Sequence, residues 1–299
     1  MLAPKLVVRL ESKPKISLII CTHNRVHTLD YSLSFYENIQ TDISYEILII
    51  LNACTDNSLE VAKKHSSINH RVKFFEEAKL GHSNARNTGW TNAQAPFVFY
   101  MDDDAYPDPN LVNELHTIIS SHKIDCISGR TIYWDYQSPK WIPSDLVEVP
   151  IFTESFGLLP KGGFINGCAC GFTTEALEKA GGFNPDVGMK GNTIGYYDEI
   201  YMQEMLQALG FDIHYAPQLL VHHQSHQKTV IAFLKAHYAH GKSRKALKTT
   251  PFISNLYSIS ISMIKASLLL IPNWIQNGIK AGTVKSYTGV FYYLGLLIG

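Results

Sequence analysis

The stretch FYMDDDAYPD, residues 99–108, places three consecutive aspartates directly behind an apolar run. Neighbouring carboxylates repel one another, and the end of a buried strand is a poor place to desolvate them. A divalent cation would stabilise such a cluster, because carboxylate oxygens are preferred ligands of Mg²⁺ and Mn²⁺. The alternative is a solvated acidic turn, in which Asp104 or Asp108 caps a helix that begins near Pro109. Taken alone, this stretch favours neither interpretation.

The chain around this stretch alternates between short apolar runs and helical patterns from Lys15 to Arg130. The runs are nearly continuous, which is typical of central strands buried on both faces. The predicted strands are 16–21, 45–51, 72–76, 96–101 and 125–129, and the predicted helices are 26–38, 57–65, 83–93 and 110–121. Such alternation predicts an α/β fold, with a doubly wound, mostly parallel sheet flanked by helices.

Polar residues follow three of the predicted strands at their carboxyl ends, where open parallel sheets bind ligands. Thr22, His23, Asn24 and Arg25 follow the first strand, residues 52–56 follow the second, and the three aspartates follow the fourth. Three polar loops on one edge are hard to explain as independent solvated turns. We therefore expect a ligand site at this edge, and the cation interpretation of the aspartates becomes the favoured one.

The overall composition sets limits on the class of protein. The chain has 299 residues, of which 45% are hydrophobic and 17% charged, so a sizeable core is expected. The formal net charge is zero, which gives no electrostatic reason to expect nucleic acid as a partner. The five scattered cysteines are interpreted as reduced thiols, and residues 1–15 do not resemble a signal peptide, so we expect a cytosolic protein.

The chain changes character after Arg130 and again near residue 228. Residues 131–163 are aromatic, Pro-rich and irregular, typical of a long loop. Beyond them the pattern predicts strands at 164–168 and 211–216, helices at 174–180 and 197–209, and a basic helix at 228–248. We expect three parts, at 15–130, 131–227 and 228–299, of which the last is a helical extension.

Two apolar segments, 256–271 and 290–299, mark the extension. Each is shorter than the roughly 20 residues that span a bilayer. We favour an in-plane position on a membrane surface over the alternative that they complete a soluble core. Four basic residues before them would suit anionic headgroups: Lys242, Arg244, Lys245 and Lys248.

The order of the motifs resembles that of the family 2 inverting glycosyltransferases, nucleotide-sugar enzymes of GT-A fold, from about Lys15 to His223. Residues 19–25 (IICTHNR) stand where the family has a strand followed by Pro-Thr-Tyr-Asn-Arg. Residues 51–56 (LNACTD) match the family's Asp-Asn-Gly-Ser-Thr-Asp, and residues 81–87 (GHSNARN) match its Ala-Arg-Asn helix start. A GT-A-like fold is therefore expected, and the resemblance implies a nucleotide-sugar-binding half at 15–130 and an acceptor-binding and catalytic half at 131–227.

The later motifs continue the resemblance. The three aspartates fall on the Asp-X-Asp signature, and residues 181–183 (GGF) resemble the Gly-Gly-Phe turn before the acceptor site. Asp198 and Glu199 occupy the position of the family's Glu-Asp pair. No single motif is specific, but six in the right order and spacing make a strong signal.

Two departures from the family pattern affect what can be expected. Leu51 replaces the aspartate that commonly binds uracil, so a base contact must come from elsewhere, and Asn52 is one candidate. A UDP-sugar remains the favoured donor. The acidic pair is reversed, which still leaves a carboxylate at the base position. The Gln-X-X-Arg-Trp motif of processive members is absent from the sequence, which favours single transfer.

The resemblance implies a role for each site residue. Glu199 is expected to be the general base, with Asp198 beside it or in its place. A divalent cation, Mn²⁺ or Mg²⁺, is expected on Asp102 and Asp104. Because His222 and His223 are adjacent, their side chains would point opposite ways on a strand; His223 is assigned to the metal, and two ordinary loop histidines are the alternative. The residues assigned to the nucleotide sugar are Thr22, His23, Asn24, Arg25, Asn52, Asp56, Lys79, Gly81, Arg86 and Asp103.

The predicted function is metal-dependent, inverting, non-processive transfer of a sugar from a nucleotide-sugar donor to a hydroxyl of a glycan, polysaccharide or lipid-linked acceptor. The predicted location is the inner face of the cell membrane, as a peripheral protein. One alternative is a nucleotidyltransferase, which would carry a Gly-rich loop after its first strand, whereas residues 21–25 contain no glycine. The other is a non-catalytic nucleotide-sugar-binding module, which retention of the aspartates and of Glu199 disfavours.

Overall fold

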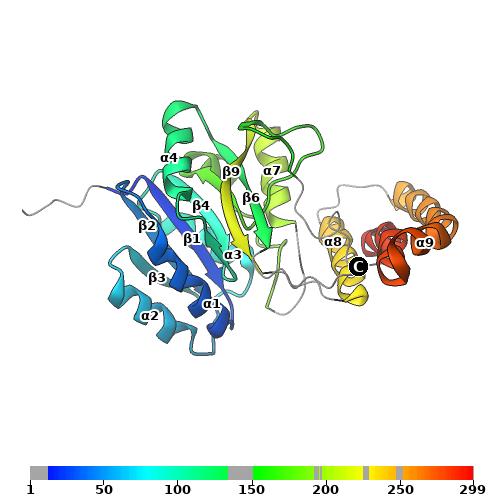
Figure 1. Cartoon of the computed structure of the whole chain (residues 1–299), viewed down its shortest axis with the longest axis horizontal. Helices are drawn as coiled ribbons and strands as arrows, with labels where there is room; N and C mark the ends of the chain where they lie inside the picture. The colour runs from blue at the N-terminus through cyan, green and yellow to red at the C-terminus, as the bar shows by residue number, and fades with distance from the viewer. Residues whose placement is uncertain are drawn as a thin grey trace, which may run out of the picture.

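The computed structural model of this chain describes residues 13–133, 151–191, 195, 197–224, 229–246 and 252–298. Two sequence predictions lie outside the described residues: the nature of the first twelve residues, and residues 134–150 of the expected long loop. Figure 1 shows a sheet with helices on both faces and, to one side of it, a helical C-terminal part.

The first half of the sheet is parallel, as predicted. Its strands lie in the order β3-β2-β1-β4, so the chain starts in the middle and winds outward. Every residue of β1 and β2 is buried, which explains their continuous apolar character. The strands are β1 (Ile16–Thr22), β2 (Tyr45–Asn52), β3 (Val72–Glu77) and β4 (Phe97–Asp102).

The second half of the sheet is mixed. Strand β8 (Cys170–Thr173) is antiparallel to both β4 and β6 (Cys126–Tyr133), and β9 (Ile213–His223) runs parallel to β6. Two short strands, β5 (Ala105–Pro107) and β7 (Gly157–Leu158), are antiparallel to β9. The sheet is therefore continuous across the boundary expected at residue 130.

The strand predicted at 164–168 is wrong, because the backbone turns there. Ala169 N donates to Asn166 O at 2.9 Å, and Cys168 N donates to Asn166 Oδ1 at 3.2 Å. These two bonds close a turn where an extended strand was expected. The strand that follows, β8, begins at Cys170, two residues after the end of the predicted range.

Helices cover both faces of the sheet, and neighbouring strand residues pack on opposite faces. Leu18 and Ile20 pack under α1 and α4, whereas Ile19 and Cys21 pack under α3, α6 and α7. The predicted helix at 26–38 is divided into α1 and a 3₁₀ turn, η1. The bounds are α1 (Val26–Leu33), η1 (Ser34–Asn38), α2 (Ser58–Ile68), α3 (His82–Asn92), α4 (Leu111–Ser121), α6 (Thr174–Ala180) and α7 (Asp198–Ala208).

The C-terminal part consists of α8 (Val230–Ala246) and α9 (Phe252–Ile298), with α9 broken at Gly278, where φ is 78°. The two stretches of α9 contact each other, since Asn273 Nδ2 donates to Ser286 Oγ at 3.0 Å. Both stretches extend beyond the apolar segments seen in the sequence. Within the described residues, Tyr257–Ile298 is long and apolar enough to cross a membrane.

Close approach of α8 and the second stretch of α9 depends on two glycines. A Cβ at Gly241 would lie 1.8 Å from Tyr292 O, and a Cβ at Gly295 would lie 2.0 Å from Tyr238 O. No side chain fits at either position, so these glycines set the distance between the two helix backbones.

Candidate active site

The loops that follow β1 and β2 are joined by hydrogen bonds. Asn24, at φ 53°, accepts through Oδ1 from Thr55 N at 2.7 Å and from Asp56 N at 3.2 Å. Asp56 Oδ2 in turn accepts from Val26 N, the first residue of α1, at 3.0 Å. Asn24 and Asp56, both assigned to the nucleotide sugar, thus hold the two loops in a fixed relation.

Asn52 joins β2 to the loop before α3. Its Oδ1 accepts from Gly81 N at 2.8 Å, and its Nδ2 donates to Lys79 O at 2.9 Å. His23 Nδ1 donates to Asn52 O at 2.6 Å, which brings the β1 loop to the same place. Asn52 is buried with both ends of its amide bonded to the backbone, so its contact with a nucleotide base stays a prediction.

Two of the three aspartates are buried against Arg25. The guanidinium of Arg25 donates to Asp103 Oδ1 and to Asp104 Oδ2, each at 2.7 Å, and Thr22 Oγ1 donates to Asp103 Oδ2 at 2.6 Å. Both aspartates are only 3% exposed. Burial raises the pKa of Asp103 to about 7, although Arg25 opposes the rise.

His223 faces the same carboxylates from β9. Its Nε2 lies 3.1 Å from Asp104 Oδ1 and 3.5 Å from Asp102 Oδ2. Burial alone would lower the pKa of His223, but hydrogen bonds to the two aspartates raise it to about 10. His222 points away and stacks on Tyr106, with ring centroids 4.9 Å apart. The two histidines therefore point opposite ways, as expected on a strand.

These side chains fit a divalent cation. Oxygens of Asp102 and Asp104 and the imidazole of His223 converge in a partly buried place, where the Asp102 side chain is 34% exposed. Arg25 binds Asp103 and Asp104, and His223, whose raised pKa favours the imidazolium, faces Asp102 and Asp104. Oxygen and imidazole donors suit Mn²⁺, with Mg²⁺ served by the oxygens alone. A cation would take over the charge balance that His223 supplies as an imidazolium.

A second charged cluster surrounds Arg86, on α3. Arg86 Nη1 lies 3.0 Å from Asp198 Oδ2 and 4.0 Å from Glu199 Oε2, and His82 Nδ1 donates to Asp198 Oδ2 at 3.0 Å. The Arg86 side chain is 3% exposed, and its guanidinium lies over the rings of Tyr100 and Phe183. Arg86 thus has a carboxylate partner inside the chain.

Asp198 and Glu199 have opposite electrostatic environments at the start of α7. Burial would raise the pKa of Asp198, but the charges of Arg86 and His82 hold it below its usual value. Burial raises the pKa of Glu199 well above its usual value, and the neighbouring charge of Asp198 adds to the rise. Two adjacent carboxylates with separated pKa values are suited to different roles.

The two clusters meet at residues 167 and 168. Arg86 Nη2 donates to Gly167 O at 3.0 Å, and a Cβ at Gly167 would lie 3.3 Å from Glu199 Cδ. The next residue, Cys168, has its thiol sulfur within 4.8 Å of ligand atoms of Asp102 and His223. Consecutive residues therefore contact the acid pair and the aspartate cluster, which makes them parts of one site.

Three of these residues were not among the site residues expected from the sequence: His82, Gly167 and Cys168. His82 lies in the GHSNARN stretch that was matched to the family, so its position alone could have suggested it. Gly167 and Cys168 had no such signal, because they lie in a segment that was predicted to be a strand.

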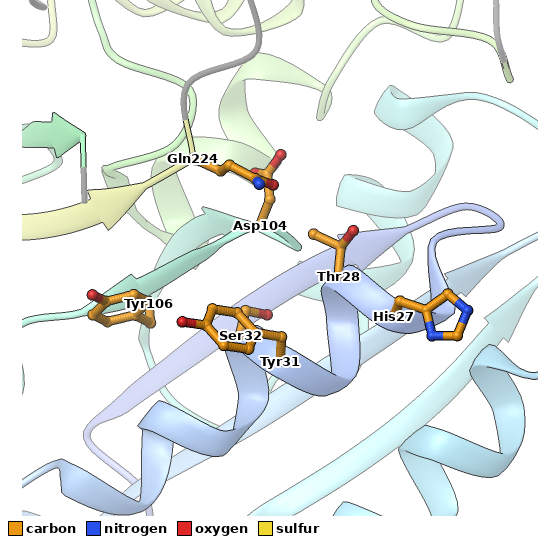
Figure 2. Close-up of a pocket in the computed structure, with 7 residues that line it drawn as sticks. All are labelled: His27, Thr28, Tyr31, Ser32, Asp104, Tyr106 and Gln224. Atoms are coloured by element: carbon orange, nitrogen blue, oxygen red, sulfur yellow. The ribbon is translucent and has the colours of Figure 1, made fainter. Parts of the chain in front are cut away.

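A pocket opens beside Asp104, between α1 and β5. Figure 2 shows Thr28 and Ser32 of α1 facing it, with Tyr106 of β5 on its far side. Gln224, directly after β9, lies beside Asp104 at its rim. The pocket places a hydroxyl-rich and aromatic wall next to the aspartate cluster.

The sequence matches the family model described as glycosyl transferase family 2 over residues 17–181, more than half of the chain. The chain belongs to glycosyl transferase family 2. The matched range contains the loops after β1 and β2, the aspartates and the start of α3. Asp198, Glu199 and His223 lie beyond it, and the structure brings them to the same place.

Curated glycosyltransferases are similar to part of the chain. A cholesterol galactosyltransferase of Borreliella burgdorferi is 31% identical over 118 residues, which are 40% of this chain and 33% of that protein. Glycosyltransferase GlyA of Streptococcus pneumoniae is 30% identical over 115 residues, which are 38% of this chain and 16% of that protein. The chain thus spans a third or less of these relatives. These similarities agree with the family match.

Solved structures show the same fold. One is a mannosyltransferase, PcManGT from Pyrobaculum calidifontis, in complex with GDP-Man and Mn²⁺. Its TM-score is 0.58 at 16% identity, and the match covers 94% of this chain and 73% of the mannosyltransferase chain. TarS of S. aureus has a TM-score of 0.55 at 16% identity, and the match covers 75% of this chain and 38% of the TarS chain. The mixed sheet flanked by helices is therefore of the GT-A glycosyltransferase type.

Proposed function

We propose that this family 2 glycosyltransferase uses a divalent cation and a nucleotide-sugar donor to transfer one sugar, with inversion, to an acceptor hydroxyl. The observation that carries the proposal is the meeting of two clusters at residues 167 and 168. One cluster gathers the oxygens and imidazole that a cation needs, and the other presents one carboxylate of raised pKa beside one held ionised.

On the donor side, Asp102, Asp104 and His223 would hold the cation. When bound, the cation supplies positive charge to the diphosphate as it leaves. Arg25 holds Asp103 and Asp104 in position from the opposite side, and the joined loops at Asn24 and Asp56 form the floor of the nucleotide site. The mannosyltransferase of the same fold binds GDP-Man and Mn²⁺, which supports a donor of this class.

On the acceptor side, Glu199 acts as the general base. Burial raises its pKa well above the usual value, and a more basic carboxylate is the better proton acceptor once it is ionised. Asp198 is 4% exposed and bonded to His82 and Arg86, so it orients the start of α7 and does not face the acceptor. A single displacement with one base inverts the anomeric centre.

The donor proposal is tested by a thermal-shift screen of nucleoside diphosphates with and without Mn²⁺. A ligand present at one hundred times its Kd adds about 2.7 kcal/mol to the stability of the folded state. We expect a shift that requires both diphosphate and Mn²⁺, with UDP and GDP compared directly. A UDP-specific shift would support the favoured UDP-sugar donor. A GDP-specific shift would instead identify guanine as the nucleobase of the donor.

The nucleotidyltransferase alternative makes a different product. Incubation with a nucleoside triphosphate and a sugar phosphate would release pyrophosphate from such an enzyme. We expect no pyrophosphate here, and its release would contradict the proposed reaction even if the cation assignment survived. Slow Mn²⁺-dependent release of nucleoside diphosphate from a nucleotide sugar, without acceptor, would separate an enzyme from a binding module.

We further propose that the C-terminal helices lie on an anionic membrane surface, which would bring the site to a lipid-linked or surface-glycan acceptor. Residues 228–299 contain nine lysines and arginines and no aspartate or glutamate, so residues 1–227 carry 17 basic against 26 acidic residues. A zero net charge thus conceals a C-terminal part of +9. Anionic lipids attract such a segment by about 1 kcal/mol per basic residue near the surface.

The first stretch of α9 presents an apolar stripe beside these charges. Ile264, Leu268, Ile271 and Ile275 follow helical spacing, and each is at least 60% exposed. The stripe has Lys265 beside it and no acidic neighbour in the sequence of the extension. A stripe of this kind, flanked by basic residues, is typical of a helix that lies in the plane of a bilayer.

We expect the double variant Leu268→Glu, Ile271→Glu to bind anionic vesicles roughly 100-fold more weakly than wild type. Each apolar side chain that leaves the bilayer loses about 1.5 kcal/mol or more. Leu209→Glu, directly after α7, changes an equally apolar, 49% exposed side chain and should leave binding unchanged. Vesicle co-sedimentation measures this, and binding that is indifferent to the double change, or to removal of anionic lipid, would contradict the proposal.

A further inference from the structure

Cys168 brings a thiol to the aspartate cluster. Its sulfur and one ligand atom each from Asp102 and His223 all lie within 4.8 Å of one another. The three residues come from the end of β4, the turn before β8 and the end of β9, so the fold itself assembles them. Among the described residues this is the one such group of histidine, cysteine and acidic side chains that could hold a metal ion.

The spacing suits an ion with a sulfur ligand. Bonds from Zn²⁺ to sulfur, nitrogen and oxygen are about 2.0–2.3 Å long, so two ligands of one ion lie at most about 4.6 Å apart. The observed separations need only small side-chain shifts to meet that limit. Cys168 is 5% exposed, so its thiol reaches the cluster from the protein interior and is shielded from bulk solvent.

The other cysteines provide a contrast. Cys126 and Cys170 are fully buried in the core cluster on the opposite face of the sheet, with Phe172 and Ile213. Cys168 belongs instead to the core cluster beneath the aspartates, together with Met101 and Ala105. Its position beside two other ligand types therefore distinguishes it from an ordinary core thiol.

We propose that Cys168 makes this centre a site for thiophilic cations, in which Zn²⁺ or Cd²⁺ binds through the Cys168 sulfur, His223 and Asp102 and competes with Mn²⁺. The inference rests on the proposed cation site and extends it. Thiolate and imidazole donors favour Zn²⁺ and Cd²⁺, whereas Mn²⁺ depends on the carboxylate oxygens. Trace thiophilic metal would then occupy the centre and block donor binding.

Binding changes the protonation of the site in a defined way. The Cys168 S–H bond and the N–H bond at the ligating nitrogen of His223 both break. Each donor atom keeps its electron pair and forms a bond to the cation, and two protons leave to solvent. No oxidant or reductant is involved. The thiolate–cadmium bond absorbs in the ultraviolet by charge transfer, which makes its formation directly visible without any measurement of catalysis.

The test is a titration of the reduced full chain with Cd²⁺ alone, followed by ultraviolet absorption. We expect a charge-transfer band that saturates at one cation per chain and is displaced by Mn²⁺ added with a nucleoside diphosphate. In Cys168→Ser the band should disappear and Cd²⁺ affinity should fall by roughly 10–100-fold or more. Mn²⁺ affinity should change far less, because oxygens carry that interaction.

Cys126→Ser is the matched control, since it makes the same change at a buried thiol away from the aspartates and should keep the band. Thermal unfolding of each variant reports whether it is folded. If Cys168→Ser does not fold, displacement of the band by Mn²⁺ and diphosphate in wild type still decides whether the thiolate lies in the centre.

A band that persists in folded Cys168→Ser, or that Mn²⁺ with diphosphate leaves unchanged, would overturn the inference. So would the absence of any band in wild type. Failure of the proposed function looks different, because Mn²⁺ itself would then produce no diphosphate-dependent thermal shift. Normal Mn²⁺ behaviour without a cadmium band would remove only the role of Cys168.

Discussion

The Asp104→Asn variant should lose nearly all transfer activity while it remains folded. Asp104 is the carboxylate that both Arg25 and His223 contact, through Oδ2 at 2.7 Å and Oδ1 at 3.1 Å respectively. A carboxamide keeps the shape of the side chain but removes the anionic ligand. We expect kcat to fall at least roughly 10²–10³-fold, the scale of a lost charge-stabilising contact.

The same variant should lose the Mn²⁺ dependence of nucleoside diphosphate binding, measured by thermal shift or calorimetry. Asp108→Asn is the matched control, because Asp108 lies in the same loop, is 36% exposed and contacts His222 instead of His223. It should keep both activity and Mn²⁺ dependence. Full activity in Asp104→Asn, or in wild type with excess chelator, would show that no cation acts there.

Replacement of Glu199 should separate donor binding from turnover. Glu199→Gln keeps the size and hydrogen bonding of the side chain but removes the proton acceptor. Turnover should fall by roughly 10²–10⁴-fold, the usual contribution of a positioned general base. Donor Kd should be nearly unchanged, because the base contacts the acceptor hydroxyl and not the diphosphate.

Asp198→Asn is the comparison that tests the assignment, and the structure predicts a different kind of loss. Asp198 neutralises Arg86, and both side chains are at most 5% exposed. Removal of its charge leaves the buried guanidinium with only Glu199, 4.0 Å away, as a carboxylate partner, so we expect a loss of up to about 3–5 kcal/mol of folding stability. We therefore expect lower stability and a smaller loss of kcat than in Glu199→Gln. If folded Asp198→Asn proved less active than Glu199→Gln, Asp198 would be the general base in place of Glu199.

The pH profile adds an independent measurement of the base. The pKa of Glu199 is raised, and the base must be deprotonated to accept a proton. Wild-type kcat/KM should therefore rise as pH increases through that pKa and level off above it. Glu199→Gln should lack this limb, and an unchanged limb would assign it to another group.

Much of the candidate site could be predicted from the sequence because its parts are local. The strands that lead into Thr22, Asn52 and Asp102 are continuous apolar runs, and the polar residues follow each run directly. The carboxyl ends of parallel neighbours share one edge, so sequence order is sufficient to bring these residues together. The prediction that His222 and His223 point apart followed in the same way from the two-residue period of a strand.

The sequence was less informative about what each of these side chains contacts. Arg86 and Asn52 were expected at the nucleotide sugar, yet Arg86 binds Asp198 and Asn52 binds backbone groups of Lys79 and Gly81. A guanidinium or an amide can form hydrogen bonds with many kinds of group, so its partner depends on which groups the fold places within reach. The break at Gly278, which separates two helical stretches that contact each other, was likewise not visible in the composition.

The sequence by itself determined the α/β architecture, the edge of the sheet that carries the candidate site and the acidic residues on it, because hydrophobic periodicity and strand ends are local properties. Only the tertiary structure decided that His82 bonds to Asp198, 116 residues away, and that Cys168 lies beside Asp102 and His223. These contacts depend on the antiparallel insertion of β8 and on the position of α7. Contacts between distant segments are set by how layers pack, and no local pattern records them.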